Sequence, residues 1–63
     1  MAKHLLRLRQ VKERVGISTA EIYRRMRDGT FPRSIPIGER SVAWDADDIE
    51  QWIKERIRLR PHA

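Results

Sequence analysis

The chain has 63 residues, a net charge of +5 and no cysteine. A chain this short forms one small domain with a modest core, and it has neither disulfides nor a cysteine-based zinc site. No apolar run approaches the roughly 20 residues of a membrane span, and the first residues lack the apolar region of a secretory signal. We therefore expect a single domain over residues 1–63, in a cytoplasmic protein that needs no cofactor.

The positive charge is concentrated in the first part of the chain. Residues 1–40 hold ten basic and four acidic side chains, whereas residues 41–63 hold four basic and five acidic ones. A basic front beside a near-neutral back is typical of a protein that binds a polyanion such as nucleic acid. Charge alone leaves ribosomal and membrane-surface roles open.

The first predicted helix covers residues 8–15. Leu8, Val11 and Val15 fall on one stripe of it at helical spacing. Gly16 follows at once, and glycine adopts the left-handed conformation that ends many helices at little steric cost.

The residues before this helix are predicted to be an arm. Residues 1–7 include Lys3 and Arg7, and Arg9 follows closely. This basic arm either tracks a nucleic-acid backbone or forms an unstructured tail; the sequence leaves both open.

A second helix is predicted from about Ser18 to Asp28, ending at Gly29. The run from Ser18 to Glu21 is a capping-box pattern, in which the Ser18 hydroxyl accepts from the Glu21 N–H and the Glu21 side chain bonds back to Ser18. Two helices joined by so short a turn must cross, so the pattern predicts a helix-turn-helix.

The faces of this second helix differ in chemistry. Ile22 and Met26 form its buried stripe, because they lie four residues apart on one side. The other side chains are distributed around it as follows: Ala20, Arg24 and Arg27 point outward, Tyr23 lies on one flank, and Glu21 and Arg25 lie on the other.

A short β-hairpin is predicted next, with alternating apolar residues in two runs. A four-residue loop and a two-residue Gly38-Glu39 turn both keep these residues on one face, so the register stays open. Pro36 lacks an N–H donor, which places its strand at an edge, and Arg40 falls near the tip. The alternating residues are Ile35, Ile37, Val42 and Trp44.

A final helix is predicted after Asp45, which caps it, and it ends before Pro61. Asp47 and Asp48 lie in its first turn, where the helix dipole favours negative charge, and residues 59–63 remain as a tail. The expected fold is therefore mainly α, a winged helix-turn-helix of three helices and a two-stranded wing. The broad apolar stripe of the last helix consists of Ile49, Trp52, Ile53 and Ile57.

The second helix carries the main functional signal. A helix that enters the major groove of DNA needs an apolar side that seats it and long cationic side chains opposite. Arg24 and Arg27 meet this need, because an arginine forms two parallel bonds with guanine, and Ala20 fits a thymine methyl group. The hypothesis fails if these guanidinium groups pack beneath the last helix or pair with the chain's own carboxylates.

Other side chains are assigned to the DNA backbone or to base edges. Thr19 at the start of the helix approaches base edges, while Tyr23 and Arg25 on the flanks approach phosphates. Arg40 at the hairpin tip suits a minor-groove or phosphate contact, with Arg33 on the approach. The alternative for each is an ordinary exposed residue of a soluble surface.

An enzyme is not expected. Capping explains the one acidic cluster, no serine has a predicted histidine neighbour, and the chain has no glycine-rich phosphate loop. The two tryptophans are assigned to the core rather than to base stacking.

Four segments, in order and closely spaced, resemble the AlpA family of prophage regulators. They run from Val11 to Arg24, from Gly29 to Pro32, from Ile37 to Trp44 and from Asp48 to Ile53. The resemblance implies a winged helix-turn-helix related to excisionases and to the DNA-binding part of MerR-type regulators. It also implies a transcriptional role, typically activation of a mobile element's integrase gene that promotes excision.

By the same resemblance the recognition helix includes Ser18, Thr19, Tyr23, Arg24 and Arg27, and the wing includes Arg40. The chain departs from the family pattern in its wing. Ala43 and Asp45 occupy positions that are frequently basic, and Glu39 replaces a frequent glycine at the tip.

The predicted protein is thus a sequence-specific transcription regulator of a phage or prophage, with double-stranded DNA as its partner. Integrase or another recombinase, RNA polymerase, and further copies of the chain on repeated sites are possible additional partners. One alternative is an excisionase-like factor that bends DNA. Another is a protein-interaction module, such as an anti-repressor or antitoxin, whose basic face meets an acidic protein.

Overall fold

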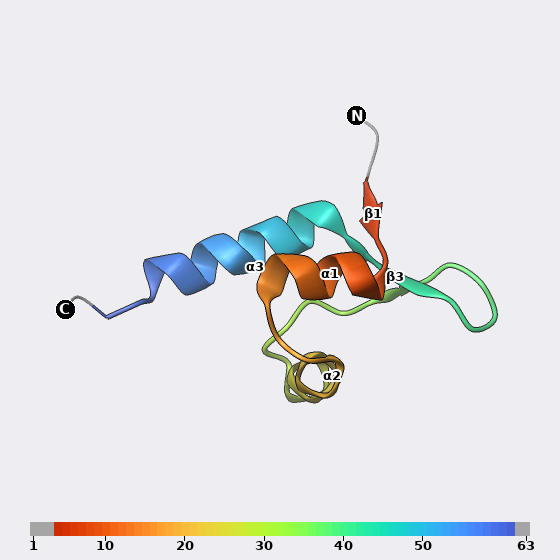
Figure 1. Cartoon of the computed structure of the whole chain (residues 1–63), viewed down its shortest axis with the longest axis horizontal. Coiled ribbons are helices and arrows are strands. Elements are labelled where there is room, and N and C mark those ends of the chain that lie inside the picture. The colour runs from red at the N-terminus through yellow and green to blue at the C-terminus, as the bar shows by residue number, and fades with distance from the viewer. Residues whose placement is uncertain (1–3, 62–63) are drawn as a thin grey trace.

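The structure is a computed structural model and describes residues 4–61. In chain order its elements are β1 (Leu5–Leu6), α1 (Leu8–Val15), α2 (Thr19–Asp28), β2 (Ile35–Pro36), β3 (Val42–Asp45) and α3 (Ala46–Arg58). In Figure 1, α2 is seen end-on below α1, so these two helices cross at a large angle, and the β2–β3 loop projects away from the helices. The predicted mainly α winged helix-turn-helix is confirmed.

Glycine ends α1, and serine begins α2, as the sequence predicts. Gly16 is left-handed, with φ of 72°, and its N–H donates to the Lys12 carbonyl at 2.8 Å. The Ser18 Oγ accepts from the Glu21 N–H at 3.2 Å. The return bond of the capping box is absent, because the Glu21 carboxylate accepts from two arginines of the same helix instead.

Every helix and two of the strands contribute to one small core. Val11 of α1, Ile22 of α2 and Ile49 of α3 are completely buried, and Met26 and Trp52 pack at the margin. These contacts confirm the predicted inward faces of the three helices. The remaining core residues are Leu6, Phe31, Ala43 and Trp44.

The predicted stripe of α3 is too long by one residue. Ile57 has an exposed fraction of 53%, although it continues the spacing of Ile49 and Ile53. Figure 1 shows the reason: the C-terminal end of α3 extends beyond the other helices and the sheet, so no other helix or strand of residues 4–61 packs on its last turn.

The expectation of a basic arm over residues 1–7 is wrong for Leu5–Leu6, which form strand β1. β1 pairs antiparallel with β3, with Leu6 opposite Trp44, and the Ala46 N–H donates to the His4 carbonyl at 2.8 Å. Leu6 is buried because its side chain packs in the hydrophobic core, while the β1 backbone pairs with the edge of β3 that β2 leaves open. Residues 1–3 of the predicted arm, and residues 62–63 of the predicted tail, lie outside the described residues.

The sheet has the order β1–β3–β2, which confirms Pro36 on an edge strand. Both loop lengths weighed from the sequence are wrong. Pro36 faces Val42, Ile35 faces Ala43, and the Ile37 N–H donates to the Ser41 carbonyl at 2.9 Å, so the loop consists of three residues, 38–40.

Loops of two or four residues would place Ile35 and Ile37 on the same face of the hairpin as Trp44, whereas a loop of three residues places them on the opposite face. Ile35 and Ile37 lie on the side opposite Trp44, where they are exposed by 39% and 45%. Trp44 instead points into the core, where its indole N–H donates to the Pro32 carbonyl at 3.0 Å. The hairpin loop nevertheless carries Arg40, as predicted.

The start of α3 follows the prediction. The Asp45 carboxylate accepts from the Asp47 N–H at 2.8 Å and caps the helix. This role explains one departure from the family pattern, since a basic residue at position 45 removes the cap. Along residues 4–61, none of the helices combines the length and hydropathy that a membrane crossing requires.

Candidate nucleic-acid interface

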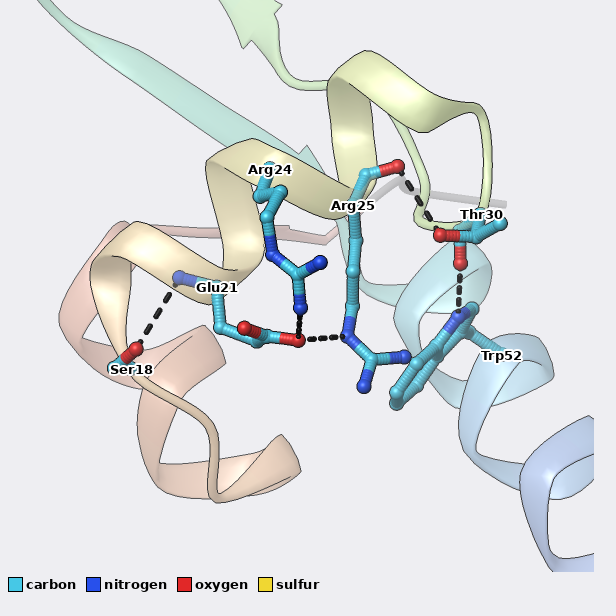
Figure 2. Close-up of polar contacts among 6 residues, drawn as sticks. All are labelled: Ser18, Glu21, Arg24, Arg25, Thr30 and Trp52. Atoms are coloured by element: carbon cyan, nitrogen blue, oxygen red, sulfur yellow. Dashed lines mark hydrogen bonds and ion pairs between the residues drawn. The ribbon is translucent and has the colours of Figure 1, made fainter.

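The orientation of α2 is fixed by its two ends. Its start follows the short turn from α1, and its C-terminal end is tied to α3 through Thr30. The Thr30 N–H and hydroxyl both donate to the Arg25 carbonyl, at 2.8 and 3.3 Å, and the Thr30 carbonyl accepts from the Trp52 indole at 2.8 Å. Figure 2 shows this chain of contacts. Since Ile22 is buried at the same time, the outward face of α2 is fixed relative to the core.

The outward face consists of the side chains that the periodicity predicts. Ala20, Arg24 and Arg27 are all exposed, and Arg24 retains 57% of its side-chain exposure. Thr19 is half-buried in the first turn, and Ser18 is exposed but uses its hydroxyl for the cap. The face therefore offers two long cationic side chains, Arg24 and Arg27. The small side chain of Ala20 lies between the Ser18 cap and Arg24.

Glu21 holds two of the three arginines of α2. Its carboxylate pairs with the Arg24 guanidinium and accepts from the Arg25 Nε at 3.0 Å (Figure 2). Arg25 is half-buried, and its side chain extends toward Trp52 on α3 in the same view. One carboxylate cannot neutralise two guanidinium groups, and an exposed pair of this kind is readily exchanged for another anion. Arg24 is thus paired with one of the chain's own carboxylates, which counts in part against the hypothesis drawn from the sequence. Arg27 has no ion pair within residues 4–61, so the outward face keeps a positive charge.

The pKa of Glu21 lies below its ordinary value of 4.5, mainly because Arg24 hydrogen-bonds the carboxylate, with a further bond from Arg25; partial burial opposes the shift. A carboxylate whose pKa is lowered by folding stabilises the native state above its unfolded pKa, and this contribution disappears as the pH falls through the folded pKa. We expect the melting temperature of the native protein to exceed that of Glu21→Gln at neutral pH, with the difference shrinking below pH 4.5. Thermal melts of both proteins across the acidic range measure it. A difference that persists undiminished into strong acid contradicts the assignment.

A hollow of about 420 Å³ adjoins one edge of the outward face. It brings Arg33, which follows α2 in the chain, to the same wall as Arg27 and Tyr23. Sequence reasoning placed Arg33 only on the approach to the wing, so its position beside Arg27 is new information. The hollow is completed by Met26 and Ser34.

A second hollow, of about 460 Å³, lies between α1, α2 and the hairpin. It brings Arg40 of the hairpin loop close to Tyr23 of α2, and Arg7 and Arg9 line it as well. From the sequence alone, Arg7 and Arg9 were expected in the N-terminal arm. The available signal was their position directly before and within the first predicted turn of α1, which fixes them to the domain. Leu8 and Val42 complete this hollow.

A third hollow, of about 630 Å³, has a different composition. Asp48 and Glu55 of α3 line it together with the aromatic ring of Trp52. Arg56 lines it as well, so its charged residues are two carboxylates and one guanidinium-bearing side chain, and the net negative charge does not suit a nucleic-acid backbone. Along the described part of the chain, residues 4–61, no three side chains of the histidine, aspartate or glutamate type gather as metal ligands would.

Comparison with known proteins places the chain in a family. The model of the family described as prophage CP4-57 regulatory protein (AlpA) matches residues 4–57. The chain is 33% identical over 64 residues to the DNA-binding transcriptional activator AlpA of Escherichia coli K12, covering 92% of this chain and 91% of that protein. It is also 33% identical over 58 residues to the uncharacterized protein ORF88 of enterobacteria phage P4, covering 92% of this chain and 66% of that one. The chain therefore belongs to the AlpA family of prophage regulatory proteins.

Proposed function

We propose that this protein is a DNA-binding transcriptional regulator of a phage or prophage, which activates an integrase gene and so promotes excision. One of its relatives carries the name of a DNA-binding transcriptional activator. The proposal treats residues 1–63 as one domain that acts on double-stranded DNA in the cytoplasm, with no catalytic step.

One observation carries the proposal: the exposed arginines of a helix whose opposite side is locked into the core. Arg24 and Arg27 project from α2 while Ile22 is completely buried beneath them. A helix of this kind, second in a helix-turn-helix, suits the major groove, where arginine pairs with guanine and Ala20 meets a thymine methyl group. Ser18 and Thr19 at the N-terminal end are proposed to lie nearest the base edges or the adjoining phosphates.

The remaining predicted residues are proposed to hold the backbone. Tyr23 and Arg25 flank the reading face, Arg33 lines a hollow beside Arg27, and Arg40 lies in the hairpin loop. One domain of this size covers few base pairs, so we propose that several copies bind repeated sites, together with RNA polymerase or the recombinase.

The salt dependence of binding tests the DNA proposal directly. Each phosphate contact adds about 0.9 to the magnitude of the slope of log affinity against log salt, so five or six contacts give a slope of roughly −5. Fluorescence anisotropy with a short labelled duplex at several salt concentrations measures it. A slope near zero contradicts binding to the DNA backbone.

The regulatory part of the proposal requires the native DNA. Footprinting on the region upstream of the protein's own gene and of an adjacent integrase gene is expected to reveal protected repeats. A reporter driven by the integrase promoter is expected to respond to the protein. Protection without any change of the reporter would exclude activation and leave DNA binding intact.

A second function is favoured by the exposed apolar residues of the wing. Ile35 and Ile37 are exposed on the side of the hairpin opposite Trp44, and Arg40 follows in the loop. Apolar side chains beside a cation are typical of proteins that wedge base steps apart and bend DNA. The excisionase-like alternative therefore predicts retarded, position-dependent mobility of circularly permuted duplexes, which pure activation does not require.

A further inference from the structure

The arginines of the described chain fall into two groups by their partners. Among residues 4–61 the ion pairs join Glu21 to Arg24 and Arg25, and Glu55 to Arg58. Within the same range, eight other arginines have no ion pair, and five of these eight line one of the two hollows that meet at Tyr23. These five are Arg7, Arg9, Arg27, Arg33 and Arg40.

The hollow between α1, α2 and the hairpin concentrates this uncompensated charge. Three arginines, Arg7, Arg9 and Arg40, line one depression, and no acidic residue lines it. They come from two segments distant in sequence, so the fold itself has brought like charges together. Such an arrangement is unfavourable in isolation, and an anion between the guanidinium groups removes the repulsion.

The wall of this hollow is rigid on the side of α2. The Tyr23 ring makes an edge contact with Trp44, with centroids 6.5 Å apart and planes inclined by 62°, and Trp44 is completely buried. The Tyr23 side chain is still 44% exposed, and its phenol is a group that donates to phosphate oxygens. Tyr23 directly precedes Arg24 on α2, so this wall is continuous with the reading face.

We propose that Arg7, Arg9, Tyr23 and Arg40 form a binding site for a single backbone phosphate of the DNA. The inference rests on the proposed DNA-binding function and adds to it. The phosphate joins the first turn of α1 to the hairpin loop, so one backbone contact sets the position of both the reading helix and the wing. Arg7 and Arg9 act from the domain and not from a trailing arm.

The test uses the full chain with Arg9→Gln, Arg40→Gln and the double variant. Arg60→Gln serves as the matched control, because it removes the same charge from an exposed residue after α3 and lines none of the three hollows. Binding to a short mixed-sequence duplex is measured across a salt series. Circular dichroism melts confirm that each variant is folded.

We expect each single variant to bind roughly three- to tenfold more weakly, and the double variant to lose about 0.9 from the magnitude of the salt slope, which is the contribution of one phosphate. Arg60→Gln is expected to keep the native slope. An unchanged slope in the double variant overturns the site, as does an equal loss in the control. A loss of about 1.8 also overturns it, since it indicates two separate phosphates.

The same measurements separate this inference from the function on which it rests. If the native protein binds the duplex with a steep salt slope and the double variant keeps that same slope, the shared phosphate site is wrong and DNA binding stands. If the native protein shows no salt-dependent binding, both fall together.

Discussion

Replacing Trp44 with alanine is expected to remove a large part of the protein's free energy of unfolding. The side chain is completely buried, contacts the Tyr23 ring and donates to the Pro32 carbonyl. Removing a buried tryptophan costs about 3–5 kcal/mol, whereas a chain of this length has a total stability of roughly 3–9 kcal/mol. Urea unfolding followed by circular dichroism measures the loss.

Two further variants make this result specific. Trp52→Ala is expected to cost less than Trp44→Ala, because Trp52 is only half-buried, although it too donates to a carbonyl, that of Thr30. Ile57→Ala changes an exposed residue and is expected to alter stability by less than about 0.5 kcal/mol. Equal losses for Trp44→Ala and Ile57→Ala would contradict the described core.

Replacing both Arg24 and Arg27 with alanine is expected to abolish recognition of the preferred DNA sequence. An arginine–guanine pair contributes about 1–3 kcal/mol of discrimination, so the double variant is expected to bind its selected site roughly 100-fold more weakly. Both side chains are exposed, which leaves the fold intact. The measurement is duplex affinity on a sequence that the native protein has selected from a random pool.

The control for this variant removes the same charge elsewhere. Arg58→Ala with Arg60→Ala changes two exposed arginines at the end of α3 and is expected to keep the sequence preference. If Arg24→Ala with Arg27→Ala leaves duplex binding unchanged, α2 is not the reading helix. In that case a protein-interaction module with a basic face becomes the better account.

The helices were predictable from sequence because their signals are local. Gly16 and Ser18 end and begin helices through contacts within four residues, and the bounds of α1 and α2 agree with the structure. The outward face of α2 follows from helical periodicity once Ile22 is assigned to the core. This outward face could therefore be predicted residue by residue.

The sheet was less predictable because its pairing is not local. Leu5–Leu6 is too short to show alternation, and its partner β3 lies far along the chain. In the hairpin, the alternation of Ile35 and Ile37 suggested a face shared with Trp44, but the three-residue loop shifts the register by one. The strand pairing and the register depend on which side chains pack best in the core of the folded domain, and the alternation of apolar residues in the sequence does not show this.

The candidate site combined both situations. The exposed arginines of α2 were predicted, but the position of Arg33 beside Arg27, and of Arg7 and Arg9 beside Arg40, depends on tertiary packing. The specific hydrogen bonds from Arg24 and Arg25 to Glu21 were not predicted, since the capping box assigned that carboxylate to Ser18. Two nearby guanidinium groups compete better for it than one backbone N–H.

The pairing of β1 with β3 also determines when the protein becomes complete during its synthesis. Leu6 leaves the ribosome early, yet its partner Trp44 is made only after α1, α2 and the wing loop. Bringing β1 and β3 together closes a long loop and costs conformational entropy, and the contacts that offset this cost form only after the loop has closed. A nascent chain halted before α3 also lacks Ile49 and Trp52, which complete the core and hold the end of α2, so the arginine surface forms as a unit only once α3 has emerged.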